Sequence, residues 1–234
     1  MRIILFGEEP STNLFIPSQK KRARVYSHFK AHLLHHLLAI ASTKELVFMA
    51  SLVTGGSGFV GQRLVEMLVE RGASKVISFD ISPKPKDALE SNKIQYVQGD
   101  LTNLADITAA SAGVECIYHI AALVGPYHPK EAYRKVNYEG TLNVLKACEL
   151  NGIKKIVMSS SPSTRFPYPD PNIEGLTEEQ LVVVNKGEYA PVFLQPYAET
   201  KALGEKAVRD ACGSKVIHYY KSCRSFKTES RGAA

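Results

Sequence analysis

The sequence lacks the signatures of several common classes of protein. None of its four cysteines stands in a C-x-x-C pair or at a metal-ligand spacing from a histidine, so we expect reduced thiols and no metal site. No apolar run reaches the roughly 20 residues that a helix needs to cross a bilayer. We therefore expect no transmembrane segment in this chain.

The body of the chain, residues 50–215, is not strongly basic, although the whole chain carries a formal net charge of +6. Residues 50–215 hold 18 lysines and arginines against 19 aspartates and glutamates. Residues 1–49 hold 7 against 3, and residues 216–234 hold 4 against 1. The surplus charge therefore belongs to the two ends, and no nucleic-acid partner is expected for the body.

The two ends also differ from the middle in their patterning. Residues 1–48 are basic, rich in hydroxyl side chains and poor in acids, which is typical of an organelle-targeting presequence. Met49 opens "MASLVTGG", a sensible domain start, so we interpret residues 1–48 as an extension, with a presequence as the alternative. Residues 216–234 open like a strand and then lose apolar periodicity. We expect a folded domain over residues 49–215 and an atypical tail after it.

Short β-prone runs alternate with helical spacing through this domain. Helical spacing follows Val60, covers about 133–150 up to the stop signal Asn151-Gly152, and returns at 197–211. This order predicts an α/β fold of the Rossmann type, a doubly wound parallel sheet with helices on both faces. The β-prone runs are 51–54, 75–79, 94–97, 116–120 and 155–158.

Four glycines stand within the seven residues of "GGSGFVG", at 55–61, between the first β-prone run and the first helix. Glycine costs a helix or strand about 0.5–1 kcal/mol relative to alanine, so this density needs a compensating gain. Gly55 and Gly56 permit a sharp turn, and Gly58 lets the backbone approach a pyrophosphate. Gly61 lets the helix pack closely on the strand. The stretch predicts a dinucleotide-binding site.

An acidic residue ends the second β-prone run. Asp80 lies 19 residues after Gly61, where a carboxylate accepts both ribose hydroxyls and repels a 2′-phosphate. The expected cofactor is therefore NAD rather than NADP, although Lys84 and Lys86 would suit a phosphate. The alternative is that Asp80 only stabilises the turn that follows it.

A second constellation carries reactive groups. The stretch "QPYAETKALGE" places Tyr197 and Lys201 four residues apart, on one face of a helix. A phenol must lower its pKa by about three units to exchange a proton near neutral pH, and a neighbouring cation contributes to that shift. The run "IVMSSSPS" adds hydroxyls at the carboxyl end of the fifth β-prone run. We select Ser161 among them, and the alternatives are Ser159, Ser160 and Ser163.

A set of motifs follows in one order along the chain: "TGGSGFVG", Asp80, "GDLTN", "HIAALVG", "VNYEGTLNVLKAC", "IVMSSS" and "YAETK". With this set, residues 50–213 resemble the extended short-chain dehydrogenases, and within them the 3β-hydroxysteroid dehydrogenase group. The resemblance is greatest to members that oxidise and decarboxylate 4-carboxysterols. It implies hydride transfer from a steroid or sterol carbon to NAD, with Tyr197 as proton acceptor, Lys201 adjusting the pKa of Tyr197 and contacting the ribose, and Ser161 holding the substrate oxygen.

The resemblance also implies a set of cofactor-binding residues. Asp100 and Leu101 would line the adenine, Ala121 and Ala122 would run beside the cofactor, and Asn137 would support the active-site helix. The complete expected set is Gly55, Gly58, Phe59, Val60, Gly61, Asp80, Asp100, Leu101, Ala121, Ala122, Asn137, Tyr197 and Lys201.

One departure from the family leaves other hypotheses open. Family members continue beyond this point with "RP" and "GPG" type segments that are absent here, so we expect a C-terminally truncated chain whose substrate lobe is largely missing. The alternatives to a steroid dehydrogenase are a sugar-nucleotide epimerase or dehydratase, and an NAD-binding protein without catalysis. We also expect a homodimer formed through residues 133–150 and 197–211. The expected location is the cytoplasm or the endoplasmic reticulum, unless residues 1–48 direct the protein to an organelle.

Overall fold

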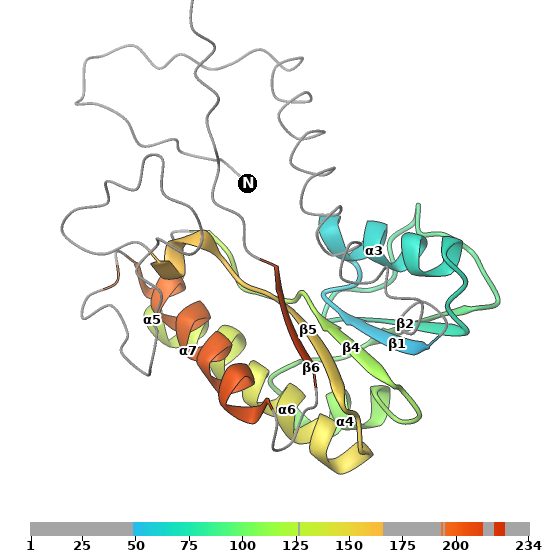
Figure 1. The fold of residues 1–234 in the computed structure, drawn as a ribbon. Coiled ribbons are helices and arrows are strands. Elements are labelled where there is room, and N and C mark those ends of the chain that lie inside the picture. The colour runs from blue at the N-terminus through green and yellow to red at the C-terminus, as the bar shows by residue number, and fades with distance from the viewer. Residues whose placement is uncertain (1–48, 126, 166–192, 194, 213–217, 223–234) are drawn as a thin grey trace, which may run out of the picture.

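The computed structural model describes residues 49–125, 127–165, 193, 195–212 and 218–222 (Figure 1). Its centre is a six-stranded sheet in the order β3-β2-β1-β4-β5-β6, and every neighbouring pair of strands is parallel. The strands are β1 (Ala50–Thr54), β2 (Lys75–Asp80), β3 (Ile94–Gln98), β4 (Cys116–His119), β5 (Lys155–Ser159) and β6 (His218–Ser222).

The expected α/β fold with a parallel sheet is confirmed. Each of the five predicted strands is present, with one end shifted by one residue. β6 adds a sixth strand, which pairs with β5 so that His218 lies opposite Lys155 and Ser222 opposite Ser159. The sheet therefore continues beyond residue 215, into the segment that the sequence analysis treated as an atypical tail.

The helices differ from the predictions in three places. Neither α4 nor the 3₁₀-helix η2 was predicted, and the predicted helix over 133–150 is a composite of a short α-helix, a π-helix and a longer α-helix. Its predicted stop is present, because Gly152 adopts a left-handed conformation with φ of +69° at the C-cap. The helices are α3 (Phe59–Glu70), α4 (Leu104–Ala110), α5 (Lys130–Tyr133), the π-helix η1 (Arg134–Glu139), α6 (Gly140–Asn151), the 3₁₀-helix η2 (Pro162–Arg165) and α7 (Pro196–Ala211).

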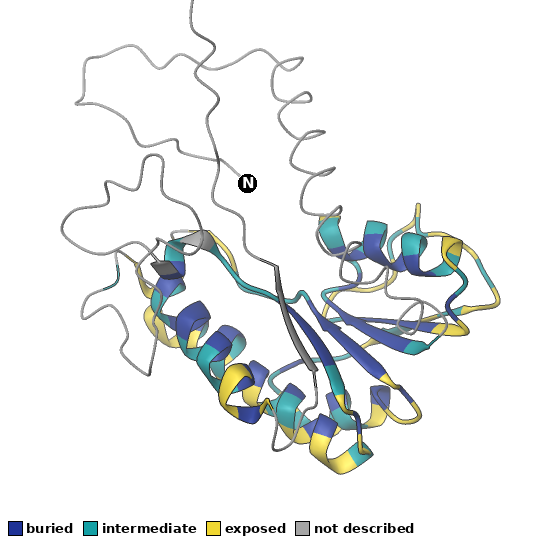
Figure 2. Ribbon diagram, viewed as in Figure 1, coloured by how far each residue is buried: buried dark blue, intermediate teal, exposed yellow. Residues whose placement is uncertain are grey.

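Both faces of the sheet are buried along β1, β2, β4 and β5, whereas the residues of the edge strand β3 are half-buried or exposed. Successive side chains of a strand point to opposite faces. Val53 packs with Leu64 and Leu68 of α3, whereas its neighbour Leu52 packs in the cluster that includes residues of α4, α6 and α7. Figure 1 shows α3 on one side of the sheet and α4, α6 and α7 on the other, and Figure 2 shows the buried strands between them. Burial on both faces explains the apolar runs of the central strands, such as Ile156, Val157 and Met158 in β5.

The order in which the strands are added to the sheet changes direction at β1, although all strands run parallel. β2 and β3 lie on one side of β1, and β4, β5 and β6 lie on the other. In open parallel sheets, ligands bind outside the carboxyl ends of the strands at such a reversal. The loops that follow Thr54, Asp80, His119 and Ser159 therefore meet at the edge where a ligand is expected.

Two further findings concern the described part of the chain. None of its helices has both the length and the apolar character required to cross a membrane. Cys116, Cys148 and Cys212 are free thiols, and burial raises the pKa of Cys116 and Cys148 to about 12. These two buried thiols are thus protonated and unreactive near neutral pH.

Candidate active site

The glycine-rich turn after β1 is held against the end of β2. The amides of Gly55 and Gly56 both donate to the carbonyl of Phe79, at 2.8 and 3.2 Å. Gly55 has a φ of +73°, and a Cβ there would lie 2.9 Å from the Cα of Ala121. A Cβ at Gly61 would lie 2.0 Å from the carbonyl oxygen of Gly55. A side chain at either position would force the turn away from its neighbours.

This turn leads directly into the N-terminus of α3. Gly58 is the N-cap residue, and no side chain caps the helix there. Phe59 is 54% exposed, and Val60 is half-buried. The first amides of a helix have no intrahelical acceptor, and the helix dipole makes this end partly positive. The N-terminus of α3 can therefore bind an anionic group such as a pyrophosphate.

Asp80, at the end of β2, is hydrogen-bonded to the glycine-rich turn. One of its carboxylate oxygens accepts a hydrogen bond from the amide of Ser57 at 3.0 Å, and the other accepts one from the amide of Ser82 at 2.9 Å. A carboxylate oxygen has two lone pairs, so each oxygen can still accept from a ligand hydroxyl. The turn-stabilising role of Asp80 is present in the structure, and a ribose contact stays a prediction.

No contact among the described residues brings Lys84 or Lys86 to the carboxylate of Asp80. The Nζ of Lys84 forms an ion pair with Glu90 and lies 5.0 Å from the centroid of the Tyr96 ring. Lys86 is exposed. A cavity of about 100 Å³ opens beside Lys84, lined by Ser57, Ser78, Ser82, Pro83, Lys84, Tyr96, Val97 and Gln98.

The residues predicted beside the adenine are largely engaged within the protein. Asp100 accepts a hydrogen bond from the amide of Thr102 at 2.8 Å, and its own amide donates to Asp106 at 2.9 Å. Leu101 is only 7% exposed, and its carbonyl accepts a bond from the side chain of Asn143 at 3.1 Å. Asp100 therefore shapes the loop after β3, whereas the Leu101 side chain belongs to the core.

A buried network that the sequence analysis did not predict joins β1, β4 and α6. The imidazole of His119 is 1% exposed, with Nδ1 2.8 Å from Oγ1 of Thr54 and Nε2 2.9 Å from Oγ1 of Thr141. The Thr54 oxygen also accepts bonds from the amides of Ile120 and Ala121, at 3.1 and 3.2 Å. His119 thus links the strand ends on which Gly55 and Ala121 approach each other.

The direction of these bonds fixes the protonation of the ring. The Thr141 hydroxyl donates to the carbonyl of Asn137 at 2.8 Å, so Nε2 of His119 carries the proton and donates to Thr141. The Thr54 hydroxyl then donates to Nδ1. Burial, followed by the charge of Lys201, lowers the pKa of His119 to about 3, so the ring is neutral.

Asn137 extends this network to the loop after β4 and to α7. Its Oδ1 accepts from the amide of Leu123 at 2.7 Å, and its Nδ2 donates to the Leu123 carbonyl at 3.0 Å and to Oγ1 of Thr200 at 3.4 Å. The residue lies in the π-helix η1, and such single π-turns occur frequently at functional sites. Asn137 was expected to support the active-site helix, and it contacts that helix, α7, through Thr200. Its direct cofactor contact stays a prediction.

α7 carries Tyr197 and Lys201 one turn apart. Lys201 is only 3% exposed, and its Nζ donates to the carbonyl of Ser159 at 2.7 Å. Tyr197 is half-buried, with its ring centroid 6.2 Å from that of Tyr133 and the two rings 72° apart. α7 can approach η1 closely because Gly204 has no side chain, and a Cβ there would lie 2.8 Å from the Asn137 carbonyl oxygen.

The serines after β5 are distinguished by their partners. Ser160 donates its hydroxyl to Oε2 of Glu205 at 2.5 Å, whereas the hydroxyls of Ser161 and Ser163 lie 2.8 Å apart. Ser159 contributes its carbonyl to Lys201. Of the four candidates, Ser160 is therefore engaged by a carboxylate from α7, and Ser161 bonds within its own turn.

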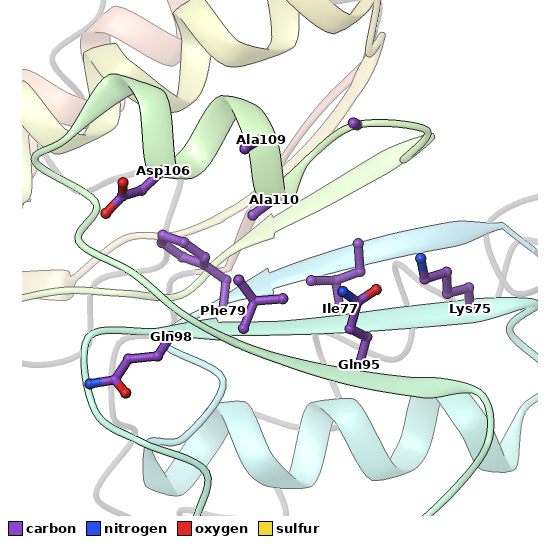
Figure 3. Close-up of a pocket in the computed structure, with 10 residues that line it drawn as sticks. Lys75, Ile77, Phe79, Gln95, Gln98, Asp106, Ala109 and Ala110 are labelled. Carbon is purple, nitrogen blue, oxygen red and sulfur yellow. The ribbon is translucent and has the colours of Figure 1, made fainter.

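A larger cavity lies away from these residues. It has a volume of about 470 Å³ and lies between the β2–β3 face of the sheet and α4 (Figure 3). Figure 3 shows Ile77 and Phe79 of β2 near Ala109 and Ala110 of α4. None of the predicted site residues lines this cavity. Among the residues that the structure describes, no three histidine, cysteine or acidic side chains form a cluster that could hold a metal ion.

The parallel sheet, its reversal at β1 and the glycine-rich turn before α3 define a dinucleotide-binding fold of the Rossmann type. Within this class, the sequence profile of the 3-beta hydroxysteroid dehydrogenase/isomerase family matches residues 52–222. The chain belongs to this family. The resemblance inferred from the motifs is thereby confirmed.

The alignments with individual relatives cover about two thirds of this chain. It is 37% identical over 160 residues to a 2-alkyl-3-oxoalkanoate reductase of Stenotrophomonas maltophilia (strain K279a), covering 68% of this chain and 46% of the relative. It is 36% identical over 162 residues to the decarboxylating sterol-4-alpha-carboxylate 3-dehydrogenase of Mus musculus, covering 68% and 40%. The chain thus spans less than half the length of these relatives.

A solved structure shares the same fold. The UDP-glucose 4-epimerase of Thermus thermophilus, solved as a complex with NAD, is 26% identical with a TM-score of 0.61. The match covers 74% of this chain and 54% of the epimerase. The similarity to an epimerase keeps the sugar-nucleotide alternative open beside the steroid hypothesis.

Proposed function

We propose that the protein is an NAD-dependent oxidoreductase that oxidises the 3β-hydroxyl group of a steroid or sterol. The observation that carries this proposal is the position of Lys201. Its buried ammonium group binds the carboxyl end of β5, one helical turn from Tyr197. A cation held in this way stabilises the ionised form of a nearby phenol. Tyr197 is thereby suited to accept a proton near neutral pH.

The cofactor assignment is supported by the edge of the sheet at β1 and β2. The partly positive N-terminus of α3, which no side chain caps, suits a pyrophosphate, and Asp80, fixed beside the turn by the Ser57 amide, suits the ribose hydroxyls. A carboxylate at this position disfavours the 2′-phosphate of NADP. Lys84, which would favour that phosphate, is already paired with Glu90. We therefore propose NAD rather than NADP.

The chemistry follows from these positions. When bound, NAD supplies the acceptor for the hydride that leaves the substrate carbon. Tyr197 takes the proton of the substrate hydroxyl as the carbon–oxygen bond becomes a carbonyl, so one hydride and one proton leave the alcohol. Ser161 holds the substrate oxygen by a hydrogen bond, and Lys201 keeps Tyr197 able to accept the proton.

The substrate class rests on membership of the family and on the names of relatives. The decarboxylating sterol dehydrogenase supports a 3β-hydroxysterol, and the NAD-bound epimerase supports a sugar nucleotide as the second candidate. We extend the proposal to a homodimer formed through α6 and α7, since Leu142 and Leu150 of α6 are exposed apolar side chains. A cytoplasmic or endoplasmic-reticulum location belongs to the same proposal.

Cofactor and substrate are tested separately on the full chain. Calorimetric titration with NAD and with NADP is expected to show tighter binding of NAD. Formation of NADH is then followed with 3β-hydroxysteroids and 4-carboxysterols as substrates. Isomerisation of UDP-glucose is followed in a separate assay, because an epimerase returns the hydride to the sugar and forms no net NADH. NADH formation with a 3β-hydroxysteroid or a 4-carboxysterol supports the proposal. Turnover restricted to UDP-glucose favours the epimerase hypothesis, and binding without any turnover refutes the catalytic part.

A further inference from the structure

Two oppositely charged side chains are buried one turn apart on α7. Lys201 is 3% exposed and Glu205 is 2% exposed. Buried charges are costly unless hydrogen bonds and opposite charges stabilise them. Lys201 has an assigned purpose in the proposed reaction, but Glu205 has none. Its burial therefore calls for a separate explanation.

The partners of these two residues are consecutive in the sequence. Lys201 donates to the carbonyl of Ser159 at 2.7 Å, and Glu205 accepts the hydroxyl of Ser160 at 2.5 Å. A hydroxyl bound to a carboxylate at this distance forms a strong, charge-assisted hydrogen bond. Since two side chains of a single helix face bind two adjacent residues, they fix both the position and the direction of the chain as it leaves β5.

The next residue in that chain is Ser161. From there the backbone turns into η2, where the amide and hydroxyl of Thr164 donate to the Ser161 carbonyl at 3.2 and 2.7 Å. Ser161 is thus held on its C-terminal side by η2 and on its N-terminal side by the residues bound to α7. The helix that carries Tyr197 therefore also sets the position of Ser161.

We propose that Glu205 is a positioning residue, which holds Ser160 so that Ser161 and Tyr197 keep a fixed relative position. This inference rests on the proposed function, because it takes Ser161 and Tyr197 as the residues that contact the substrate oxygen. It also gives the three neighbouring serines different roles. Ser159 binds Lys201 through its carbonyl, Ser160 binds Glu205, and Ser161 is left to contact the substrate.

The test compares four variants of the full chain. Glu205→Ala removes the acceptor, Glu205→Gln keeps an oxygen acceptor without the charge, and Ser160→Ala removes the donor. Asp210→Asn is the matched control, because Asp210 lies on the same helix and its side chain is 60% exposed. Amide hydrogen exchange of residues 159–165, NAD affinity, and kcat and KM for a 3β-hydroxysteroid are measured for each.

We expect faster exchange at residues 159–165 in Glu205→Ala and Ser160→Ala, with NAD affinity unchanged. In the same variants kcat should fall about 10- to 100-fold, since displacements near 1 Å have effects of that size, while KM changes little. Glu205→Gln should recover most of the loss, and the effects of Ser160→Ala and Glu205→Ala should not add. The control should match the unsubstituted protein.

The proposal is overturned if exchange at residues 159–165 is unchanged in Glu205→Ala, or if that variant keeps its full kcat. An equal rise in exchange throughout the protein would reduce Glu205 to a general stabilising residue and would also overturn it. If the unsubstituted chain turns over no substrate, the proposed function fails. The exchange measurement still decides whether Glu205 and Ser160 fix the end of β5.

Discussion

Nε2 of His119 lies 2.9 Å from Oγ1 of Thr141, and both side chains are buried at the centre of the molecule. Thr141 in turn donates to the carbonyl of Asn137, which lies on η1. On its other side the ring accepts the Thr54 hydroxyl at the end of β1. A single neutral imidazole thus connects the strand before the glycine-rich turn with the helix segment that contacts α7.

Removal of this ring should weaken the whole fold. In His119→Ala both threonine hydroxyls lose a buried partner and a cavity remains. Each unsatisfied buried group costs about 1–3 kcal/mol, so we expect the free energy of unfolding to fall by about 2–5 kcal/mol. Denaturation by urea measures the change. His128→Ala is the control, because His128 is exposed, and a comparable loss there would contradict the assignment.

The same residue should make stability depend on pH. Burial, with a smaller contribution from Lys201, lowers the pKa of His119 from 6.5 to about 3 in the folded state. Between these values only the unfolded chain binds the proton. The free energy of unfolding therefore decreases as the pH falls from about 6.5 towards 3, by about 1.4 kcal/mol per pH unit, and His119 adds no dependence above that range.

The measurement is the difference in unfolding free energy between the unsubstituted chain and His119→Gln as a function of pH. Other titrating groups contribute to both proteins and cancel in this difference. The unsubstituted chain should lose stability more steeply on acidification. Parallel curves for the two proteins would show that the folded state binds a proton on His119 as readily as the unfolded chain does.

Gly204→Ala should destabilise the protein, although alanine is the better helix former by about 1 kcal/mol. The added Cβ would lie 2.8 Å from the Asn137 carbonyl oxygen and 3.2 Å from Oγ1 of Thr141. Overpacking of this kind costs about 1–3 kcal/mol, which outweighs the gain in propensity. Thermal unfolding decides the sign of the change in stability, and Lys206→Ala is the control, because the Lys206 side chain lies on the same helix and is 39% exposed. An increase in stability would mean that α7 does not pack against η1 at this distance.

Local patterns account for the parts of the fold that could be predicted. Strand positions follow from short apolar runs, and the glycine-rich turn is recognisable because its geometry excludes side chains at 55 and 61. α4 has only seven residues, and its apolar face, which consists of Leu104, Ile107 and Ala110, is too short to show a helical period. Its start was nevertheless encoded, since Asn103 caps the amide of Ala105 at 3.0 Å.

Other features depend on residues that are far apart in the sequence. His119 and Thr54 are separated by 65 positions, and Ser160 and Glu205 by 45, so no periodicity or local motif could pair them. His119 stood within the motif "HIAALVG", but the motif alone does not show what its ring contacts. The π-helix η1 likewise makes long-range contacts, because the Asn137 side chain bonds to Leu123 after β4 and to Thr200 of α7.

Asp80→Ala should weaken NAD binding. The substitution removes the proposed acceptor of the ribose hydroxyls and releases the amides of Ser57 and Ser82. Hydrogen bonds to charged groups contribute about 1.5–3 kcal/mol, so the dissociation constant should rise about 10- to 100-fold. The preference for NAD over NADP should narrow at the same time. Calorimetry measures both, with the exposed Asp87→Ala as control. An unchanged affinity for NAD would remove Asp80 from the cofactor site.

Tyr197→Phe should abolish hydride transfer and leave NAD affinity almost unchanged. The variant keeps the aromatic ring that packs edge-on against Tyr133, so the start of α7 should keep its position. It lacks only the hydroxyl that we propose accepts the substrate proton, and loss of a positioned general base lowers rates by about 100- to 10,000-fold. Tyr127→Phe is the control, since Tyr127 is 86% exposed. Single-turnover measurement of NADH formation separates the chemical step from product release, and undiminished formation in Tyr197→Phe would assign the proton transfer to another group.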